Sequence, residues 1–167
     1  MEVESSPNHG ATFRVYLPIA KETVRPRRRP KVRSAVLGGS ETILLVEDQP
    51  WIRDGLREFL VSQGYKVLEA QNGIEALQIG KAHAAGIDVL VTDVIMPQLR
   101  GVELSKLLAE THPGICVIFM SGYSEDALME HQLLSERNVP LMQKPFEAED
   151  LAHKVREVLD EKSGDCR

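Results

Sequence analysis

The chain has 167 residues, of which 43% are hydrophobic and 27% charged, a composition typical of one globular domain with an appended segment. No apolar run approaches the roughly 20 residues that cross a bilayer, and no secretory signal opens the chain. We therefore expect a cytoplasmic protein. The two cysteines, Cys116 and Cys166, are too few for a disulfide framework or a cysteine zinc site.

The net charge of -5 is unevenly distributed along the chain. Residues 1–33 hold eight Lys or Arg against three Asp or Glu, whereas residues 34–167 hold twelve against twenty-two. An acidic body repels nucleic acid and suits a divalent cation. This balance makes nucleic acid an unlikely partner of the larger part of the chain.

The first segment, residues 1–19, has two alternating stretches around a Pro/Asn/Gly turn, a pattern that predicts a β-hairpin. Because an isolated hairpin is marginally stable in water, it is expected to belong to a larger sheet. With Gly10-Ala11-Thr12-Phe13 before its last strand, it resembles the C-terminal end of the ATP-binding domain of sensor histidine kinases. The resemblance implies only a remnant of that domain. No adenine site and no phosphodonor histidine motif accompany it, so this chain should not bind ATP.

Residues 20–40 are predicted to be a disordered basic linker. The stretch Arg25–Arg33 has no hydrophobic periodicity, contains two prolines and carries charges that repel one another. A solvated tether is the simplest interpretation. A basic patch for nucleic acid or anionic lipid is the alternative.

From Glu41 onward, strand-like and helix-like segments alternate. Five such units predict an α/β fold, a doubly wound five-stranded parallel sheet with helices on both faces, and the natural strand order is the flavodoxin-like 2-1-3-4-5. In the helices, Ile74 and Leu107 are among the side chains expected to face inward. The predicted strands are Thr42–Glu47, Tyr65–Ala70, Ile87–Thr92, Ile115–Met120 and Pro140–Gln143, and the predicted helices are Pro50–Gln63, Gly73–Ala85, Val102–Glu110, Glu125–Glu136 and Glu147–Glu161.

Polar side chains follow four of these strands. Glu47-Asp48 come after the first strand, Asp93 after the third, Ser121-Gly122 after the fourth and Lys144-Pro145 after the fifth. The carboxyl ends of parallel strands meet at one edge of a sheet, where such folds bind their ligands. We therefore expect three carboxylates, one hydroxyl and one ammonium group to converge there.

Three clustered carboxylates repel one another unless a cation joins them, and an all-oxygen site favours Mg²⁺. Lys144 and Ser121 offer a positive charge and a hydrogen-bond donor, which suit a phosphoryl group. The Asp93 carboxylate can act as a nucleophile toward phosphorus and form an acyl phosphate. The sequence thus predicts a Mg²⁺-dependent phosphoacceptor site.

Residues 41–161 carry these elements in the order and spacing of a CheY-like receiver domain of the two-component response regulators, and they resemble that family; residues 162–167 would form a tail. The resemblance implies that Asp93 is the phosphoacceptor, Ser121 the switch hydroxyl and Lys144 the phosphate-binding lysine. It also implies that Asp48, Asp93 and the backbone carbonyl of Ile95 bind Mg²⁺ directly, with Glu47 holding it through water.

The expected partner is a histidine kinase or a His-containing phosphotransfer protein. Because a kinase-like strand precedes the receiver, the chain resembles a hybrid sensor histidine kinase truncated to its C-terminal receiver. The chain would then be attached to a membrane only through the parent kinase. No effector domain is expected after Glu161, and the chain is expected to be a signalling domain rather than an enzyme.

One departure from the family pattern and two alternative functions remain open. Receivers commonly carry an aromatic switch residue where this chain has Leu141, so Tyr123 is a candidate replacement. An aspartyl-phosphate phosphohydrolase on a related fold is the first alternative, but it would want a second Asp at the place of Ile95. Nucleic-acid binding through the basic linker is the second.

Overall fold

The computed structural model describes residues 2–7, 10–16, 38–83, 85–123, 129 and 139–164. The chain divides into two compact units, residues 1–35 and residues 36–167. Within the described ranges, none of the helices combines the length and the hydropathy required to cross a membrane. The predicted linker over 20–40, of which the structure describes 38–40, and the predicted helix over 125–136, of which it describes Met129, fall almost wholly outside these ranges.

The first unit contains an antiparallel hairpin, as the alternating pattern of residues 1–19 predicts. Strand β1 (Glu2–Ser6) pairs with strand β2 (Gly10–Arg14), with Val3 opposite Phe13 and Glu4 opposite Thr12. Gly10 has φ +80°, a conformation that costs glycine little and other residues much. The glycine at the turn and the alternating pattern of the strands are therefore both consistent with a hairpin.

The second unit is built on a five-stranded parallel sheet. Its strands run in the order β4-β3-β5-β6-β7, which is the predicted order 2-1-3-4-5. The central strand β5 carries the sequence VLVTD, and its first four residues are buried, as expected for a strand covered on both faces. The strands are β3 (Thr42–Val46), β4 (Lys66–Ala70), β5 (Val89–Asp93), β6 (Cys116–Ser121) and β7 (Leu141–Gln143).

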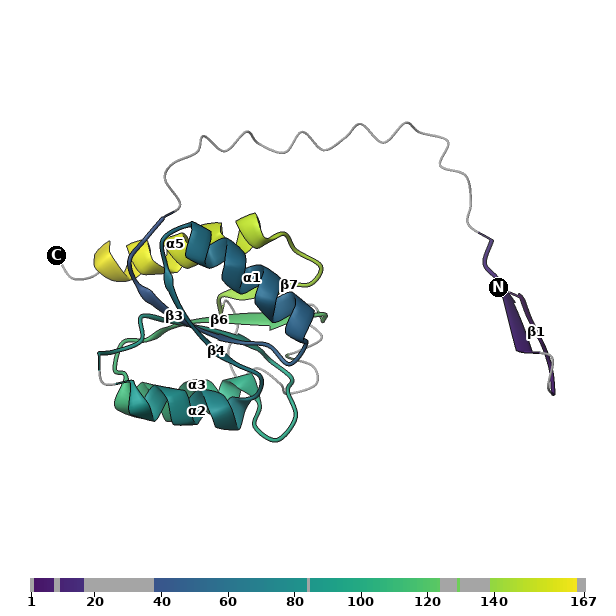
Figure 1. The fold of residues 1–167 in the computed structure, drawn as a ribbon, viewed down its shortest axis with the longest axis horizontal. Coiled ribbons are helices and arrows are strands. Elements are labelled where there is room, and N and C mark those ends of the chain that lie inside the picture. Colours follow the sequence, from purple (N-terminus) through teal and green to yellow (C-terminus); the bar gives the residue numbers. More distant parts are fainter. Residues whose placement is uncertain are drawn as a thin grey trace, which may run out of the picture. The chain divides into compact units, whose positions relative to one another are not determined.

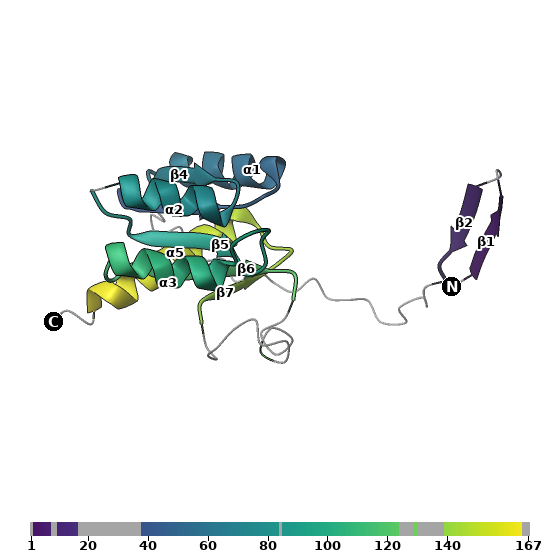
Figure 2. The ribbon, with the colours of Figure 1, turned by 90° about the horizontal axis from the view of Figure 1, so that it is seen from below.

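Helices cover both faces of this sheet. Helices α1 (Pro50–Ser62) and α5 (Ala148–Gly164) lie on one face, and α2 (Gly73–Ala82) and α3 (Gly101–Thr111) lie side by side on the other (Figures 1 and 2). The sequence predicts α1 and α3 to within a residue at each end. It overestimates α2 at its C-terminus and ends α5 three residues early.

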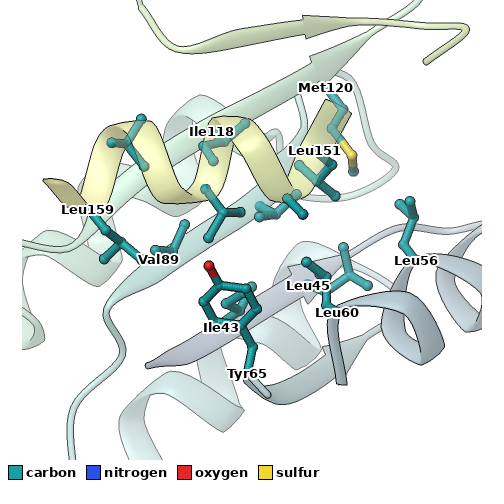
Figure 3. Close-up of a cluster of buried hydrophobic side chains, with 14 residues drawn as sticks. Ile43, Leu45, Leu56, Leu60, Tyr65, Val89, Ile118, Met120, Leu151 and Leu159 are labelled. Carbon is teal, nitrogen blue, oxygen red and sulfur yellow. The ribbon is translucent and has the colours of Figure 1, made fainter. Parts of the chain in front are cut away.

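The core beneath α1 and α5 is made of large aliphatic side chains. Ile43 and Leu45 of β3, Leu60 of α1 and Leu151 of α5 meet there, and all four are almost completely buried (Figure 3). Complete burial of side chains of this size contributes roughly 1.5–3 kcal/mol each. This packing holds the carboxyl ends of the strands in place.

The packing of α2 against α3 differs from the prediction. Ile74 is 46% exposed and Leu107 is 38% exposed, although both were expected to face inward. The buried residues of α2 are instead small, among them Ala76 and Gly80. A Cβ at Gly80 would collide with the side chain of Leu108, so the close approach of the two helices selects small residues over large apolar ones.

Gly101, the first residue of α3, connects the fold to the end of β5. An added Cβ there would collide with the carbonyl oxygen of Asp93, and main chain cannot move as a flexible side chain would. We predict that Gly101→Ala lowers the free energy of unfolding by about 2 kcal/mol in a urea titration. The matched control is Gly55→Ala in α1, where a Cβ meets nothing within 4 Å and should stabilise the helix by up to about 1 kcal/mol. Equal effects of the two substitutions would contradict this account.

Candidate functional site

The predicted carboxylates converge at the carboxyl edge of the sheet. Glu47 and Asp48 directly follow β3, and Asp93 ends the adjacent strand β5. One carboxylate oxygen from each of the three residues lies within 4.8 Å of the others. The order β4-β3-β5 makes β3 and β5 neighbours, so the convergence follows from the topology.

Lys144, one residue past β7, joins two of these carboxylates. Its ammonium nitrogen Nζ donates to Glu47 Oε2 at 2.6 Å and to Asp93 Oδ2 at 3.0 Å. Glu47 has a fully buried side chain, while that of Lys144 is 22% exposed. Burial alone would lower the pKa of Lys144, but the hydrogen bonds to Asp93 and Glu47 outweigh it and raise that pKa, so the lysine is charged at neutral pH.

Asp93 keeps one oxygen without a hydrogen bond. Lys144 Nζ lies 2.8 Å from Asp93 Oδ1, close enough to count as an ion pair, yet Oδ1 is buried and has no hydrogen-bond partner of acceptable geometry. A buried carboxylate oxygen left in this way costs free energy unless a ligand takes it up. The ammonium group of Lys144 therefore offsets the charge at Oδ1, while the lone pairs of this oxygen are free to bind a ligand.

The electrostatics of Asp93 agree with this interpretation. Burial is the main reason that the pKa of its carboxyl rises to about 6, above the ordinary 3.8. The hydrogen bond from Lys144 opposes the rise, and the neighbouring charges of Glu47 and Asp48 add to it. Three acidic groups with an all-oxygen donor set fit a hard divalent cation such as Mg²⁺, which would relieve this repulsion.

Ser121 and Ile95 both lie close to the acidic cluster, but Ser121 is buried and the side chain of Ile95 is exposed. Ser121 ends β6, the strand beside β5, and is 6% exposed. Its hydroxyl oxygen accepts a hydrogen bond from the Tyr123 backbone N–H at 3.0 Å, and its carbonyl accepts one from the Lys144 N–H at 2.7 Å. Ile95, two residues after Asp93, has a side chain that is 49% exposed. Ser121 is thus tied through its backbone to the lysine, and its hydroxyl proton is available to a ligand.

Two aromatic residues near this edge are largely exposed. Trp51 in the first turn of α1 is 73% exposed, and Tyr123 after β6 is 55% exposed. Leu141, at the place where receivers commonly carry an aromatic switch residue, is half-buried against Val94 and Phe119. No aromatic ring therefore occupies the position at which the family usually has one.

Sequence reasoning missed one residue at this site. Arg53 of α1 donates from Nη1 to the carbonyl oxygen of Glu47 at 2.8 Å. A hydrogen bond from a side chain to the main chain leaves no pattern in the sequence, because any long donor six residues along could make it. Only the structure identifies this contact.

The fold and the acidic site together define a doubly wound α/β domain with three clustered carboxylates at the carboxyl edge of its sheet. The family described as the response regulator receiver domain matches residues 43–156, and the chain belongs to it. It carries a receiver domain of the two-component systems, a signalling module with which a phosphoacceptor role fits.

The chain is similar to a sensor kinase and to a sporulation phosphotransferase. It is 40% identical over 164 residues to the sensor kinase CckA of Brucella abortus, an alignment that covers 94% of this chain and 17% of that kinase. It is 32% identical over 125 residues to the sporulation initiation phosphotransferase F of Bacillus subtilis, covering 74% of this chain and 98% of that protein. A crystal structure of the receiver domain of a hybrid histidine kinase CckA matches with a TM-score of 0.60 and 36% identity, over 71% of this chain and 98% of the other.

The raised pKa of Asp93 predicts a pH-dependent stability. Because the folded state binds the Asp93 proton more tightly than the unfolded state, ionisation of this carboxyl costs folding free energy above pH 6, and the cost disappears toward pH 4. Asp93→Asn should therefore stabilise the metal-free protein by about 2 kcal/mol at pH 8 in urea titrations, with a gain that shrinks as the pH falls below 6. Asp54→Asn, an exposed change on α1, is the control. A gain that grew at low pH would contradict the assignment.

Proposed function

We propose that Asp93 accepts a phosphoryl group from the phosphohistidine of a histidine kinase or a His-containing phosphotransfer protein. A carboxylate oxygen of Asp93 attacks phosphorus, the P–N bond to the histidine breaks, and an acyl phosphate forms on the aspartate. The single observation that carries this proposal is the convergence of one carboxylate oxygen each from Glu47, Asp48 and Asp93 within 4.8 Å of one another, beside the ammonium group of Lys144. The comparison with a sensor kinase supports the choice of donor.

The other side chains have roles that follow from their positions. Lys144, already 2.8 Å from Asp93 Oδ1, is placed to bind oxygens of the incoming phosphoryl group and to offset their charge. Ser121 accepts from the Tyr123 N–H and keeps its own hydroxyl proton to donate to a phosphoryl oxygen. These two residues would report the phosphorylated state to β6 and β7.

Mg²⁺ would be held by Asp48, Asp93 and the carbonyl of Ile95, with Glu47 acting through water. When bound, the ion would neutralise the clustered carboxylates and the phosphoryl oxygens during transfer. The donor set supports this assignment, since it contains only oxygen and one oxygen from each of its three carboxylates lies within 4.8 Å of the others.

The signal is proposed to leave through the surface around β6 and β7. With Leu141 packed against Val94 and Phe119, no aromatic side chain at that place can move between exposed and buried positions. The change would instead pass from Ser121 to the residues that follow β6, starting with Tyr123. We place this switch in the cytoplasm, in a chain that is a phosphoacceptor rather than an enzyme.

Residues 1–19 are proposed to be the C-terminal hairpin of a kinase ATP-binding domain, followed by a linker over 20–40 and the receiver over 41–161. Polar side chains of the hairpin contact one another: Arg14 forms an ion pair with Glu4 at 2.7 Å, and the Tyr16 hydroxyl donates to Glu2 at 3.0 Å. On the opposite face, Phe13 is 65% exposed. Such an amphipathic hairpin supports an origin in a larger sheet, and the 94% coverage of this chain by the sensor kinase alignment extends that support to the N-terminal unit.

Phosphorylation tests the main proposal. Incubation of the full chain with Mg²⁺ and acetyl phosphate should add one phosphoryl group to the intact mass. Asp93→Asn should abolish the gain, and Lys144→Ala should slow it at least about 10-fold, because the lysine offsets charge in the transition state. Labelling that persisted in Asp93→Asn, or that did not need a divalent cation, would contradict the proposed site.

Hydrogen exchange tests the origin of the hairpin. If it is a part of a larger sheet, amides of residues 2–14 should exchange within seconds in this chain, while those of β3 and β5 stay protected. Addition of ATP should change neither, because a remnant lacks the nucleotide site. Protection of the hairpin equal to that of β3, or a new protection on adding ATP, would contradict the assignment.

A further inference from the structure

Arg53 differs from Arg57, the other arginine of α1, in its burial and in its contacts. Its side chain is only 16% exposed, and it reaches back from the helix to donate to the carbonyl oxygen of Glu47 at 2.8 Å. That carbonyl belongs to the peptide unit between Glu47 and Asp48, the two carboxylate residues that follow β3. Arg53 therefore contacts the main chain that connects two members of the acidic cluster.

The main chain on the other side of Glu47 is also fixed. The Glu47 N–H donates to the carbonyl of Ala70 on β4 at 3.2 Å, and Gln49 N–H donates to Glu47 Oε1 at 3.3 Å. With Arg53 bound to the carbonyl, the backbone of Glu47 is held at both its N–H and its C=O. The orientation of the peptide plane between Glu47 and Asp48 then determines the direction in which the Asp48 side chain projects.

The position of the Asp48 carboxylate depends on how the backbone of Glu47 is held. Its side chain is exposed, and among the described residues no hydrogen bond or ion pair holds its carboxylate. Glu47 is different, because Lys144 binds its buried carboxylate directly. If the peptide between them turned, the Asp48 carboxylate would move away from Asp93 and the cluster would lose one ligand.

Arg53 itself is positioned by Glu69 on β4. The Nε of Arg53 lies 3.8 Å from Glu69 Oε2, and the Nε of Arg57 lies 3.3 Å from Glu69 Oε1. Both arginines therefore share one counter-charge, but only Arg53 contacts the acidic loop. Arg57, whose side chain is 43% exposed, provides a matched control with the same charge on the same helix.

We infer that Arg53 is a positioning residue of the metal site: through the Glu47 carbonyl it sets the direction of Asp48 and so the affinity for the divalent cation. The inference rests on the proposed function of the acidic cluster. It predicts the opposite sign from simple electrostatics. Removing a positive charge close to three carboxylates should tighten Mg²⁺ binding, whereas removing a positioning hydrogen bond should weaken it.

The test is a Mg²⁺ titration of the full chain by calorimetry, with Arg53→Met and Arg57→Met compared with the unchanged protein. Methionine keeps much of the apolar stem of arginine and removes its donors and its charge. We expect Arg53→Met to raise the Kd for Mg²⁺ by roughly 10-fold, the size typical of residues that orient metal ligands. Arg57→Met should stay within about twofold of the unchanged protein.

Phosphorylation by acetyl phosphate separates positioning from general damage. In Arg53→Met, the Mg²⁺ concentration that gives half-maximal labelling should rise, while the rate at saturating Mg²⁺ should stay within about twofold, since Arg53 does not touch the reacting atoms. Circular dichroism verifies the fold. If Arg53→Met does not fold, Arg53→Lys, which keeps the charge on a shorter stem, should still raise the Kd at least about threefold.

Unchanged or tighter Mg²⁺ binding in the folded variant would overturn the inference, as would an equal loss in Arg57→Met. A failure of the proposed function looks different. The unchanged protein would then bind no Mg²⁺, and Asp48→Asn would behave in the same way, in which case both the metal site and the role of Arg53 are wrong.

Discussion

The ammonium group of Lys144 between the carboxylates of Glu47 and Asp93 is the interaction on which this site depends. Two acidic groups at the buried edge of a sheet repel each other, and one of them, Glu47, has no exposure to solvent. A charged lysine from the end of β7 offsets that repulsion at 2.6 Å and 2.8 Å. The same contact links the edge strand β7 to the central strands β3 and β5.

This contact satisfies the carboxylate of Asp93 only in part. Lys144 donates a hydrogen bond to Oδ2 and lies 2.8 Å from Oδ1, but Oδ1 accepts no hydrogen bond of acceptable geometry. Burial, with the charges of Glu47 and Asp48, raises the pKa of Asp93 and makes its ionised form costly. Under the proposed function, a bound divalent cation would lower this cost, and the ionised carboxylate of Asp93 would then act as the nucleophile toward phosphorus. The strain is local, because the sheet behind it is packed with fully buried aliphatic residues.

The sequence was sufficient for the strand ends and insufficient for the packing around them. Asp93 could be found because the apolar run VLVT stops at it, and Lys144 because it follows a short strand before a proline. Both residues can be located because the alternation of strands and helices gives the order of the strands and the point at which each one ends. Ile74 was misplaced because the pattern of large apolar residues ignores how closely two helices approach, and Gly80 shows that here the approach is close.

Other features depend on three-dimensional contacts that carry no local pattern. The bond from Arg53 to a main-chain carbonyl, the orphaned oxygen of Asp93 and the sharing of Glu69 by two arginines are of this kind. Burial of Glu47 could not be read from its sequence position either, since a glutamate after a strand is more often exposed. The convergence of these side chains at one edge of the sheet was therefore predictable from the sequence, whereas their individual contacts and burial required the structure.

The central claim is that the phosphoryl group resides on Asp93 itself. Borohydride reduces an acyl phosphate on aspartate to homoserine, so the chain phosphorylated with acetyl phosphate and Mg²⁺ can be reduced, digested and sequenced by mass spectrometry. The account predicts homoserine at position 93 and aspartate at position 48. Homoserine at position 48, or a phosphoryl group that resists reduction because it is on a hydroxyl such as Ser121, would contradict it.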